Sequence, residues 1–452
     1  MRAPLPALPL AALVLAALAC RPPAPGAGRP PGGADDSARP ADSGGDSGLD
    51  TGDPPAVTVL HPAAGIGPEA LAIVVNADDP LSAARAAAYA DAWGIPEGRI
   101  VALPLGAGPS LSADAFAVQK AALDAALGPE VQALLLAFAA PYQVGCMGAT
   151  AAFALGFDPA WCQAGPPCLP TAESPLYRTD TRQPFQEHGV RYAMMLAVPD
   201  ADAAAALAAR GRASVATNPP GTVHLVGTTD AARNVRAPDY AVTAERFDPA
   251  SLALAVTDAT AGDPEALQGA TGVLGYLTGL TAVPGLDTLA FAPGALADHL
   301  TSYGGVLDGS TGQMPITDWL TAGATASYGT AHEPCNYPQK FPKASVLWPA
   351  YFRGATAVEA YWQSVQWPGE GNFVGDPLAR PFAPEITVDG RTVTLRTSWP
   401  DRRRTVQLEG APSPDGPWEL LQGGIEGGPT HRWHTLQVDA GPHAVVRLVE
   451  AP

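Results

Sequence analysis

The densest group of chemically active side chains lies between residues 298 and 335 of this 452-residue chain. The segment offers a thiol and a hydroxyl as nucleophiles, imidazoles as bases, and carboxylates that would orient the bases. Small residues between them would let backbone N–H groups face an oxyanion. One functional alternative is therefore a hydrolase or peptidase. Its nucleophile would be Cys335 or Ser302, its base His299 or His332, and its orienting acid Asp298 or Glu333.

A second set of polar residues follows strands that the sequence predicts. Ligands of an open parallel sheet bind in the crevice at the carboxyl ends of its strands, so these side chains are expected to line one pocket. The competing interpretation is structural, because residues at such positions also cap helices and form turns. The predicted ligand pocket comprises Asn76, Asp78, Tyr142, Thr278, Asp298, Thr301 and Tyr328.

The chain has five cysteines, of which Cys20 lies apart in an N-terminal leader. The other four are an even number in a chain that is expected to be exported, where thiols oxidise. Two disulfides are therefore expected, which argues against a free thiol at Cys335. Cys162 and Cys168 flank a Gly-Pro-Pro loop and are candidates for one bridge, leaving Cys146 for Cys335, although three pairings are possible.

Motifs for a resident metal or cofactor are missing from the sequence. It contains no CxxC or HExxH spacing and no glycine-rich loop followed by Lys-Ser/Thr, so no metal, cofactor or phosphate cradle is expected. With 26 basic and 44 acidic side chains the formal net charge is −18. Binding to a nucleic-acid backbone requires a positively charged surface, and a chain with this excess of acidic side chains is not expected to have one. Nucleic acid is therefore excluded as a partner.

The elements that must position these residues occupy residues 56–383. Continuous apolar runs such as 71–75 and 133–138 predict strands buried on both faces, and stretches such as 112–127 between them predict amphipathic helices. Strands alternating with helices predict a doubly wound, mostly parallel, flavodoxin-like α/β sheet. From 384 to 452 the pattern changes to apolar residues at every second position, which predicts a small β-sandwich of the fibronectin III or immunoglobulin kind.

The N-terminal residues predict export. Residues 1–19 have a basic start at Arg2, an apolar run too short to span a bilayer, and small residues before a cleavage point. Cys20 follows directly, so the segment resembles a bacterial lipoprotein signal, in which this cysteine is lipidated and anchors the protein to a membrane. Plain secretion is the alternative. Residues 20–55 are rich in Pro, Gly and Asp and predict a disordered linker. The resemblance to a lipoprotein signal also implies the outer membrane of a Gram-negative bacterium as the destination, because Arg21, and not Asp, follows the cysteine.

Several strings of the predicted α/β body resemble the signature of a family of exported bacterial proteins that has no established activity. They are DHLTSYGG at 298–305, GATASYGTAHEPC at 323–335 and GDPLARPF at 375–382. The order of elements is also similar, more distantly, to gingipain-type cysteine peptidases, whose catalytic domain has a caspase-like fold. Those enzymes place His-Gly after one strand and Cys after the next. The matching positions here are Thr278-Gly279 and Thr301-Ser302, the latter following a short strand expected at 289–291.

This resemblance implies a caspase-like scaffold without the peptidase dyad. The first functional hypothesis is therefore an exported lipoprotein that binds an unidentified small molecule or protein partner, and the second is the hydrolase described above. A third, a glycan-binding surface protein, depends on the β-sandwich and on Trp418 and Trp433. The sequence leaves open whether the protein is an enzyme.

Overall fold

The computed structural model describes residues 56–62, 65–162, 168–247, 251–399, 404–428 and 433–452. The predicted signal peptide, the lipidation site Cys20 and the predicted linker lie outside these residues. Within the described ranges, no helix is both long enough and apolar enough to cross a membrane.

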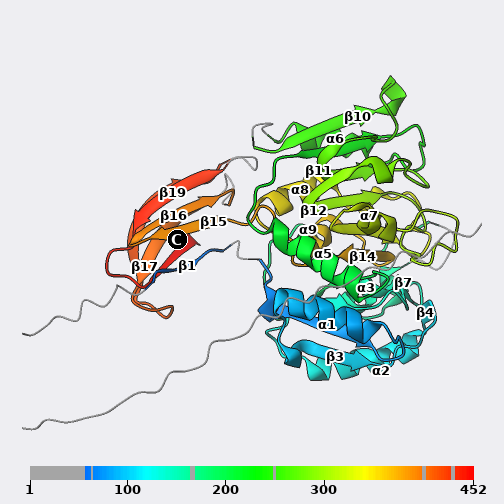
Figure 1. Ribbon diagram of the computed structural model, residues 1–452, viewed down its shortest axis with the longest axis horizontal. Helices are drawn as coiled ribbons and strands as arrows, with labels where there is room; N and C mark the ends of the chain where they lie inside the picture. The colour runs from blue at the N-terminus through cyan, green and yellow to red at the C-terminus, as the bar shows by residue number, and fades with distance from the viewer. Residues whose placement is uncertain (1–55, 63–64, 163–167, 248–250, 400–403, 429–432) are drawn as a thin grey trace, which may run out of the picture. The chain divides into compact units, whose positions relative to one another are not determined.

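A ten-stranded sheet forms the centre of the α/β body (Figure 1). Its strand order is β10-β9-β11-β12-β13-β14-β8-β5-β2-β3. Pairing is parallel from β10 to β13 and from β8 to β3, whereas β13 and β14 pair antiparallel. The strands are β2 (Leu71–Asn76), β3 (Ile100–Leu103), β5 (Ala133–Leu136), β8 (Tyr192–Met195), β9 (Thr222–Gly227), β10 (Ala253–Asp258), β11 (Thr271–Thr278), β12 (Ala290–His299), β13 (Ala326–Thr330) and β14 (Gly371–Gly375).

The helices connect these strands. They begin and end where local chemistry requires: Ser112 accepts the N–H of Ala115 at the start of α2, and Gly94 ends α1 at a φ of 69°. The predicted mixed α/β body with a large, mostly parallel sheet is confirmed. The helices are α1 (Ser82–Trp93), α2 (Ala113–Ala126), α3 (Ala149–Leu155), α4 (Pro184–His188), α5 (Ala201–Ser214), α6 (Ala237–Ala244), α7 (Thr317–Ala322), α8 (Ala344–Phe352) and α9 (Ala357–Ser364).

The apolar pattern of the sequence did not predict two strands of the sheet correctly. β12 continues far beyond the predicted 289–291 and ends at Asp298 and His299, two polar residues that are nevertheless fully buried. β14 is short and begins at Gly371, where a Cβ atom would lie 2.2 Å from the hydroxyl of Tyr328. Only glycine fits at that position. Both strands depend on tertiary packing that local propensity does not contain.

The C-terminal residues form two sheets around a separate apolar core that includes Val393, Leu408 and Val446. Their alternating burial supports the predicted β-sandwich. β1 (Thr58–Leu60), which the sequence analysis placed in the α/β body, pairs in parallel with β20 of this unit. The sheets consist of β15 (Glu385–Asp389), β16 (Thr392–Thr397) and β19 (His434–Asp439), and of β1, β20 (Val445–Glu450), β17 (Thr405–Ala411) and β18 (Glu419–Glu426). A further small sheet joins β4 (Ser110–Leu111), β6 (Gln143–Val144) and β7 (Met147–Gly148).

Candidate functional site

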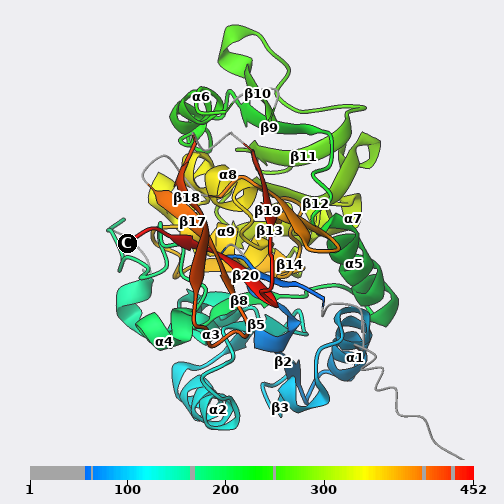
Figure 2. The same cartoon turned by 90° about the vertical axis from the view of Figure 1, so that its left-hand side faces the viewer.

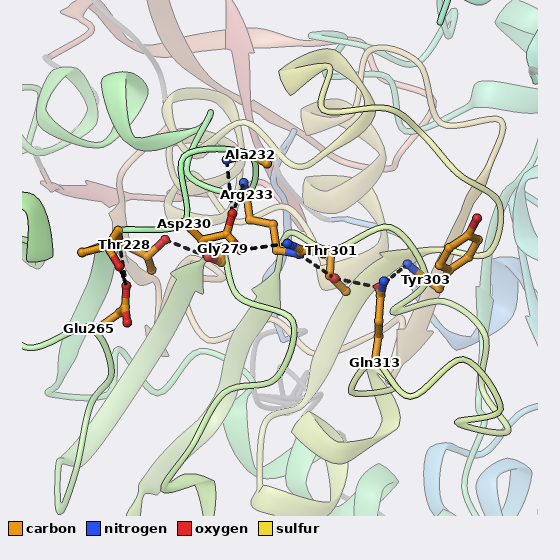
Figure 3. A network of polar contacts seen from close by, with 10 residues as sticks. Thr228, Asp230, Ala232, Arg233, Glu265, Gly279, Thr301, Tyr303 and Gln313 are labelled. Atoms are coloured by element: carbon orange, nitrogen blue, oxygen red, sulfur yellow. Dashed lines mark hydrogen bonds and ion pairs between the residues drawn. The ribbon is translucent and has the colours of Figure 1, made fainter. Parts of the chain in front are cut away.

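The carboxyl ends of β9, β11 and β12 meet at one edge of the sheet, because these strands pair in parallel. Polar side chains form a network along this edge (Figure 3). Arg233 donates from Nη1 to Asp230 at 2.8 Å and from Nε to the hydroxyl of Thr301 at 3.1 Å. Thr301 donates in turn to Oε1 of Gln313 at 2.7 Å, and this oxygen also accepts the N–H of Tyr303 at 2.8 Å. We call these five residues the rim network.

Of the three residues that the sequence analysis matched to the peptidase dyad, Thr278 and Thr301 have hydroxyls that face inward, whereas Ser302 is partly exposed. Thr278 and Thr301 are both 0% exposed. The Thr301 hydroxyl is held by Arg233 on one side and Gln313 on the other. The Thr278 hydroxyl has no hydrogen-bond partner among the described residues, and its carbonyl accepts from Nη2 of Arg236 at 2.6 Å. Neither oxygen reaches solvent, so neither meets a substrate in this conformation.

One of the points where the strand order reverses lies between β9 and β11, and ligands of doubly wound folds usually bind at such a point. Here Thr228, directly after β9, donates its hydroxyl proton across this point to the carbonyl of Gly279 at 2.8 Å. The neighbouring Thr229 donates its N–H and its hydroxyl to Glu265, and these bonds lower the pKa of Glu265. The reversal point is therefore bridged by the protein's own groups.

Asp298 belongs to a buried ion pair. Its Oδ1 lies 2.6 Å from Nη1 of Arg236, and both side chains are almost fully buried. Burial raises the pKa of Asp298 to about 6, against the opposing influence of the guanidinium. Oδ2 of Asp298 and Nε of Arg236 have no hydrogen-bond partner among the described residues. Asp298 is thus buried against Arg236, and no hydrogen bond among the described residues joins its carboxylate to the His299 ring.

His299 is a structural histidine. Its Nε2 lies 3.1 Å from the carbonyl of Met314, and its Nδ1 accepts the indole N–H of Trp319 at 3.0 Å. Burial lowers the pKa of His299 to about 3, so the ring is neutral. With both nitrogens occupied and the ring 0% exposed, His299 has no free lone pair for a substrate proton.

The remaining predicted catalytic residues make separate contacts. His332 Nε2 lies 2.9 Å from the carbonyl of Gly145, and burial lowers the pKa of His332. Glu333 accepts the N–H of Cys335 at 3.0 Å, which is a local turn. Among the hydrogen bonds between described residues, none joins the Ser302 hydroxyl to His299 or His332.

The four cysteines of the described body form two disulfides, as predicted from their number. The bridges are Cys146 with Cys162 and Cys168 with Cys335, not the suggested 162–168 and 146–335. Sequence proximity misled that suggestion, because the segment after β13 runs back to residue 168. Cys335 therefore has no free thiol and cannot be a nucleophile in this oxidised state.

The predicted pocket residues on β2 lie far from the rim network. Asn76 is fully buried, and its amide donates to the carbonyls of Gly106 at 2.8 Å and Ala140 at 3.1 Å. Asp78 is exposed and accepts the N–H of Gly106. β2 is six strands from β11 in the sheet order, which at about 4.8 Å per strand is about 29 Å. The predicted residues therefore do not form one pocket.

The two tyrosines of that prediction differ in position. The Tyr142 hydroxyl donates to Asp308 at 2.9 Å, and its ring packs with Val306 and Ala331, close to the rim network. Burial raises the pKa of Tyr142 to about 12. Tyr328 is fully buried and donates to the carbonyl of Lys340 at 2.7 Å, inside the core. Only Tyr142 lies near the candidate site.

Sequence reasoning missed Gln313 and Arg236. Gln313 lies in an irregular segment between β12 and α7, where no periodicity points to a role. Arg236 precedes α6 and resembles a surface arginine until the fold places Asp298 against it. Within the described ranges, no group of three or more His, Cys, Asp or Glu side chains could hold a metal ion.

Two solved structures are similar to this chain. One, described as "Structure of Protease", shares 10% sequence identity at a TM-score of 0.38, covering 85% of this chain and 97% of that chain. The other, the Arg-specific cysteine proteinase gingipain R, shares 10% identity at a TM-score of 0.39, covering 86% and 98%. No family model and no curated protein matches the sequence. The chemistry of this chain is therefore judged from its own residues.

Proposed function

We propose that this chain is an exported, lipid-anchored outer-membrane protein whose caspase-like α/β body binds a ligand or partner without peptidase chemistry. The observation that carries the proposal is that Thr278 and Thr301-Ser302 stand at the dyad positions: the hydroxyls of Thr278 and Thr301 are buried, and the partly exposed Ser302 makes no hydrogen bond to a histidine among the described residues. A serine or threonine nucleophile needs a base within hydrogen-bond reach, and Thr301 contacts Arg233 and Gln313 instead.

Separate observations argue against each main residue of the alternative hydrolase hypothesis. The Cys335 sulfur is bonded to Cys168, and both nitrogens of His299 are occupied. What remains, Ser302 with His332, makes no mutual hydrogen bond among the described residues. Arg233, which is partly exposed and oriented by Asp230, supports recognition of a bound group instead of bond cleavage.

Active-site probes test the absence of peptidase chemistry. We expect neither a peptidyl acyloxymethyl ketone, which traps catalytic cysteines, nor a fluorophosphonate, which traps catalytic serines, to label the unreduced full-length protein. The physical reason is that all four cysteines of the described residues are in disulfides and that no serine or threonine hydroxyl at the candidate site is hydrogen-bonded to a histidine there. Intact-mass spectrometry measures the labelling, with papain and trypsin as positive controls. Stoichiometric labelling of Ser302 or Cys335 would refute this part of the proposal.

Fractionation tests the proposed anchor. In a Gram-negative host, the full-length protein is expected in the outer-membrane fraction, and the Cys20→Ala variant in the soluble periplasmic or extracellular fraction. The reason is that acylation at Cys20 would supply the membrane affinity that the protein lacks without it. A Val118→Ala variant, which changes an exposed residue of α2 and leaves both disulfides intact, is the control and should stay with the membrane. Equal partition of the Cys20→Ala and unsubstituted proteins would contradict the lipid anchor.

A further inference from the structure

A cavity of about 470 Å³ opens beside α6 and α8, and none of the five residues of the rim network lines it. Figure 2 shows these two helices next to each other, and they are in contact. Four chain segments line the cavity: residues 177–178, 235–246, 338–345 and 364–366. The volume lies within the range of about 300–1,000 Å³ that small-molecule sites occupy.

The charge of the cavity is opposite to that of the chain. Its lining includes four basic side chains, Arg178, Arg236, Arg246 and Lys343, against one acidic side chain, Asp239; Arg236 is also paired with the buried Asp298, so four positive and two negative charges leave an excess of two positive charges. The whole chain has a formal net charge of −18. A chain this acidic repels anions in general, so a local concentration of cations around one cavity attracts them to that place.

The carboxylate of Asp239 is already satisfied. It accepts the N–H of Ser345 at 2.8 Å and its hydroxyl at 2.6 Å, and Nζ of Lys343 lies 3.9 Å away. Arg236 lines the cavity although only 4% of it is exposed, and its Nε has no hydrogen-bond partner among the described residues. A buried guanidinium N–H without an acceptor is costly, and a bound anion would supply that acceptor.

Backbone hydrogen bonds link the segments that line the cavity, so the cavity is formed without a ligand. The N–H of Arg178 donates to the carbonyl of Gln363, that of Trp367 to Gln339, and that of Lys343 to Ser364. These bonds measure 2.9–3.0 Å and cross between segments far apart in the sequence. The Cys168–Cys335 bridge anchors the chain just before Pro338. A preformed cavity loses little entropy when it binds a ligand.

Arg178 adopts a backbone conformation that is unfavourable for arginine. Its φ is +59°, in the left-handed region that favours glycine. Its guanidinium lies over the ring of Tyr177, 5.2 Å from the centroid, at the cavity. Glycine would suit the backbone better, so an arginine at this position has a conformational cost, which points to a role for its side chain.

We infer that this cavity binds a small organic anion: an acidic head group, carboxylate or phosphate, joined to an apolar or aromatic body. The basic side chains, Arg178 above all, would receive the head group. Tyr177, Val242 and Phe341 would pack against the body. Val242 is an exposed apolar residue, 44% accessible, beside these cations. This inference rests on the proposed binding function and specifies its ligand class.

Fluorescence titration tests the inference, with 8-anilinonaphthalene-1-sulfonate as the anionic probe and the full chain carrying Cys20→Ala, so that neither lipid nor detergent competes. One site is expected, and the uncharged N-phenyl-1-naphthylamine should bind at least about tenfold more weakly. Arg178→Gly should weaken binding of the anionic probe about fivefold while the protein unfolds at no lower urea concentration. Val242→Trp, which fills the cavity, should weaken binding about tenfold or more.

Matched controls separate the cavity from the rest of the surface. Val118→Trp replaces a valine of α2 that is 66% exposed, and Arg212→Gln removes an exposed charge from α5; both should bind the probe normally. Displacement by phenyl phosphate or benzoate, but not by phenol, supports the inference and identifies the head group. Normal binding by Arg178→Gly and Val242→Trp, equal displacement by phenol, or no binding at all overturns it. Those outcomes leave the probe-labelling result untouched, so the failure of either idea is recognisable.

Discussion

Replacing Cys168 and Cys335 by serine is expected to lower the free energy of unfolding by about 5 kcal/mol. The bridge closes a loop across a sequence separation of 167 residues, so its loss frees a large part of the unfolded chain. The Cys146–Cys162 bridge spans only 16 residues, and its removal is expected to cost about 3 kcal/mol. Urea unfolding of both double variants under non-reducing conditions measures the difference.

The two bridges also allow a test of additivity. Residues 146–162 and 168–335 do not overlap, so the loops close independently and the two losses should add in a quadruple variant. Nested bridges, as in the 162–168 and 146–335 pairing, would not behave in this way. A larger loss for the Cys146–Cys162 pair than for the Cys168–Cys335 pair would contradict the chain-entropy explanation.

The Arg236→Met variant is expected to lose about 3–5 kcal/mol of stability at pH 8. The substitution leaves the Asp298 carboxylate buried without its cation, at 0% exposure. Methionine keeps much of the side-chain volume, so the loss reports the charge and not a cavity. Chemical unfolding at several pH values measures it.

The pH dependence of this variant has a defined sign. Burial holds the pKa of Asp298 at about 6 in the folded protein, above the usual value, so its protonated form favours folding. Stability from this group is fully present below about pH 4 and is lost as the pH rises through about 6. Without Arg236 the pKa rises further. The deficit of Arg236→Met relative to the unsubstituted protein should therefore grow from pH 4 to pH 8.

An exposed ion pair provides the control. Arg99 contacts Glu130 at 2.5 Å, but the Glu130 side chain is 54% exposed. Arg99→Met should lower the stability far less than Arg236→Met does, because water solvates the remaining carboxylate. Adding Asp298→Asn to Arg236→Met should restore part of the lost stability. If Arg236→Met lowers the free energy of unfolding no more than Arg99→Met does, the buried pair of Arg236 and Asp298 does not stabilise the fold.

The apolar pattern predicted much of the parallel sheet because consecutive buried residues such as 71–75 need no tertiary information to be recognised. It failed where burial includes polar groups. The sequence pattern does not reveal that β12 ends at Asp298 and His299. These polar side chains can be buried because they form hydrogen bonds with Arg236 and Trp319, which belong to other parts of the chain. It also failed at Gly371, where the Tyr328 ring and not local propensity requires a glycine.

The candidate site was less predictable than the fold. The sequence predicted Thr301 as a pocket residue, and the structure joins it at 3.1 Å to Arg233, although Thr301 follows β12 and Arg233 follows β9, with β11 between these strands. It placed Asn76 in the same pocket because β2 also ends in polar residues, but the strand order puts β2 six strands from β11. Strand order depends on crossovers between distant segments, and a local pattern does not encode it.

The sequence by itself determined the alternation of strands and helices, the change to a period of two after residue 384, the acidic balance and the even number of body cysteines. These are properties of composition and of neighbours along the chain. Only the tertiary structure decided which cysteines pair, that Thr278 and Thr301 are buried, and that four distant segments enclose a basic cavity. Burial and proximity depend on contacts between residues that can lie hundreds of positions apart in the sequence. These contacts, and the energy they contribute, form only when the chain folds.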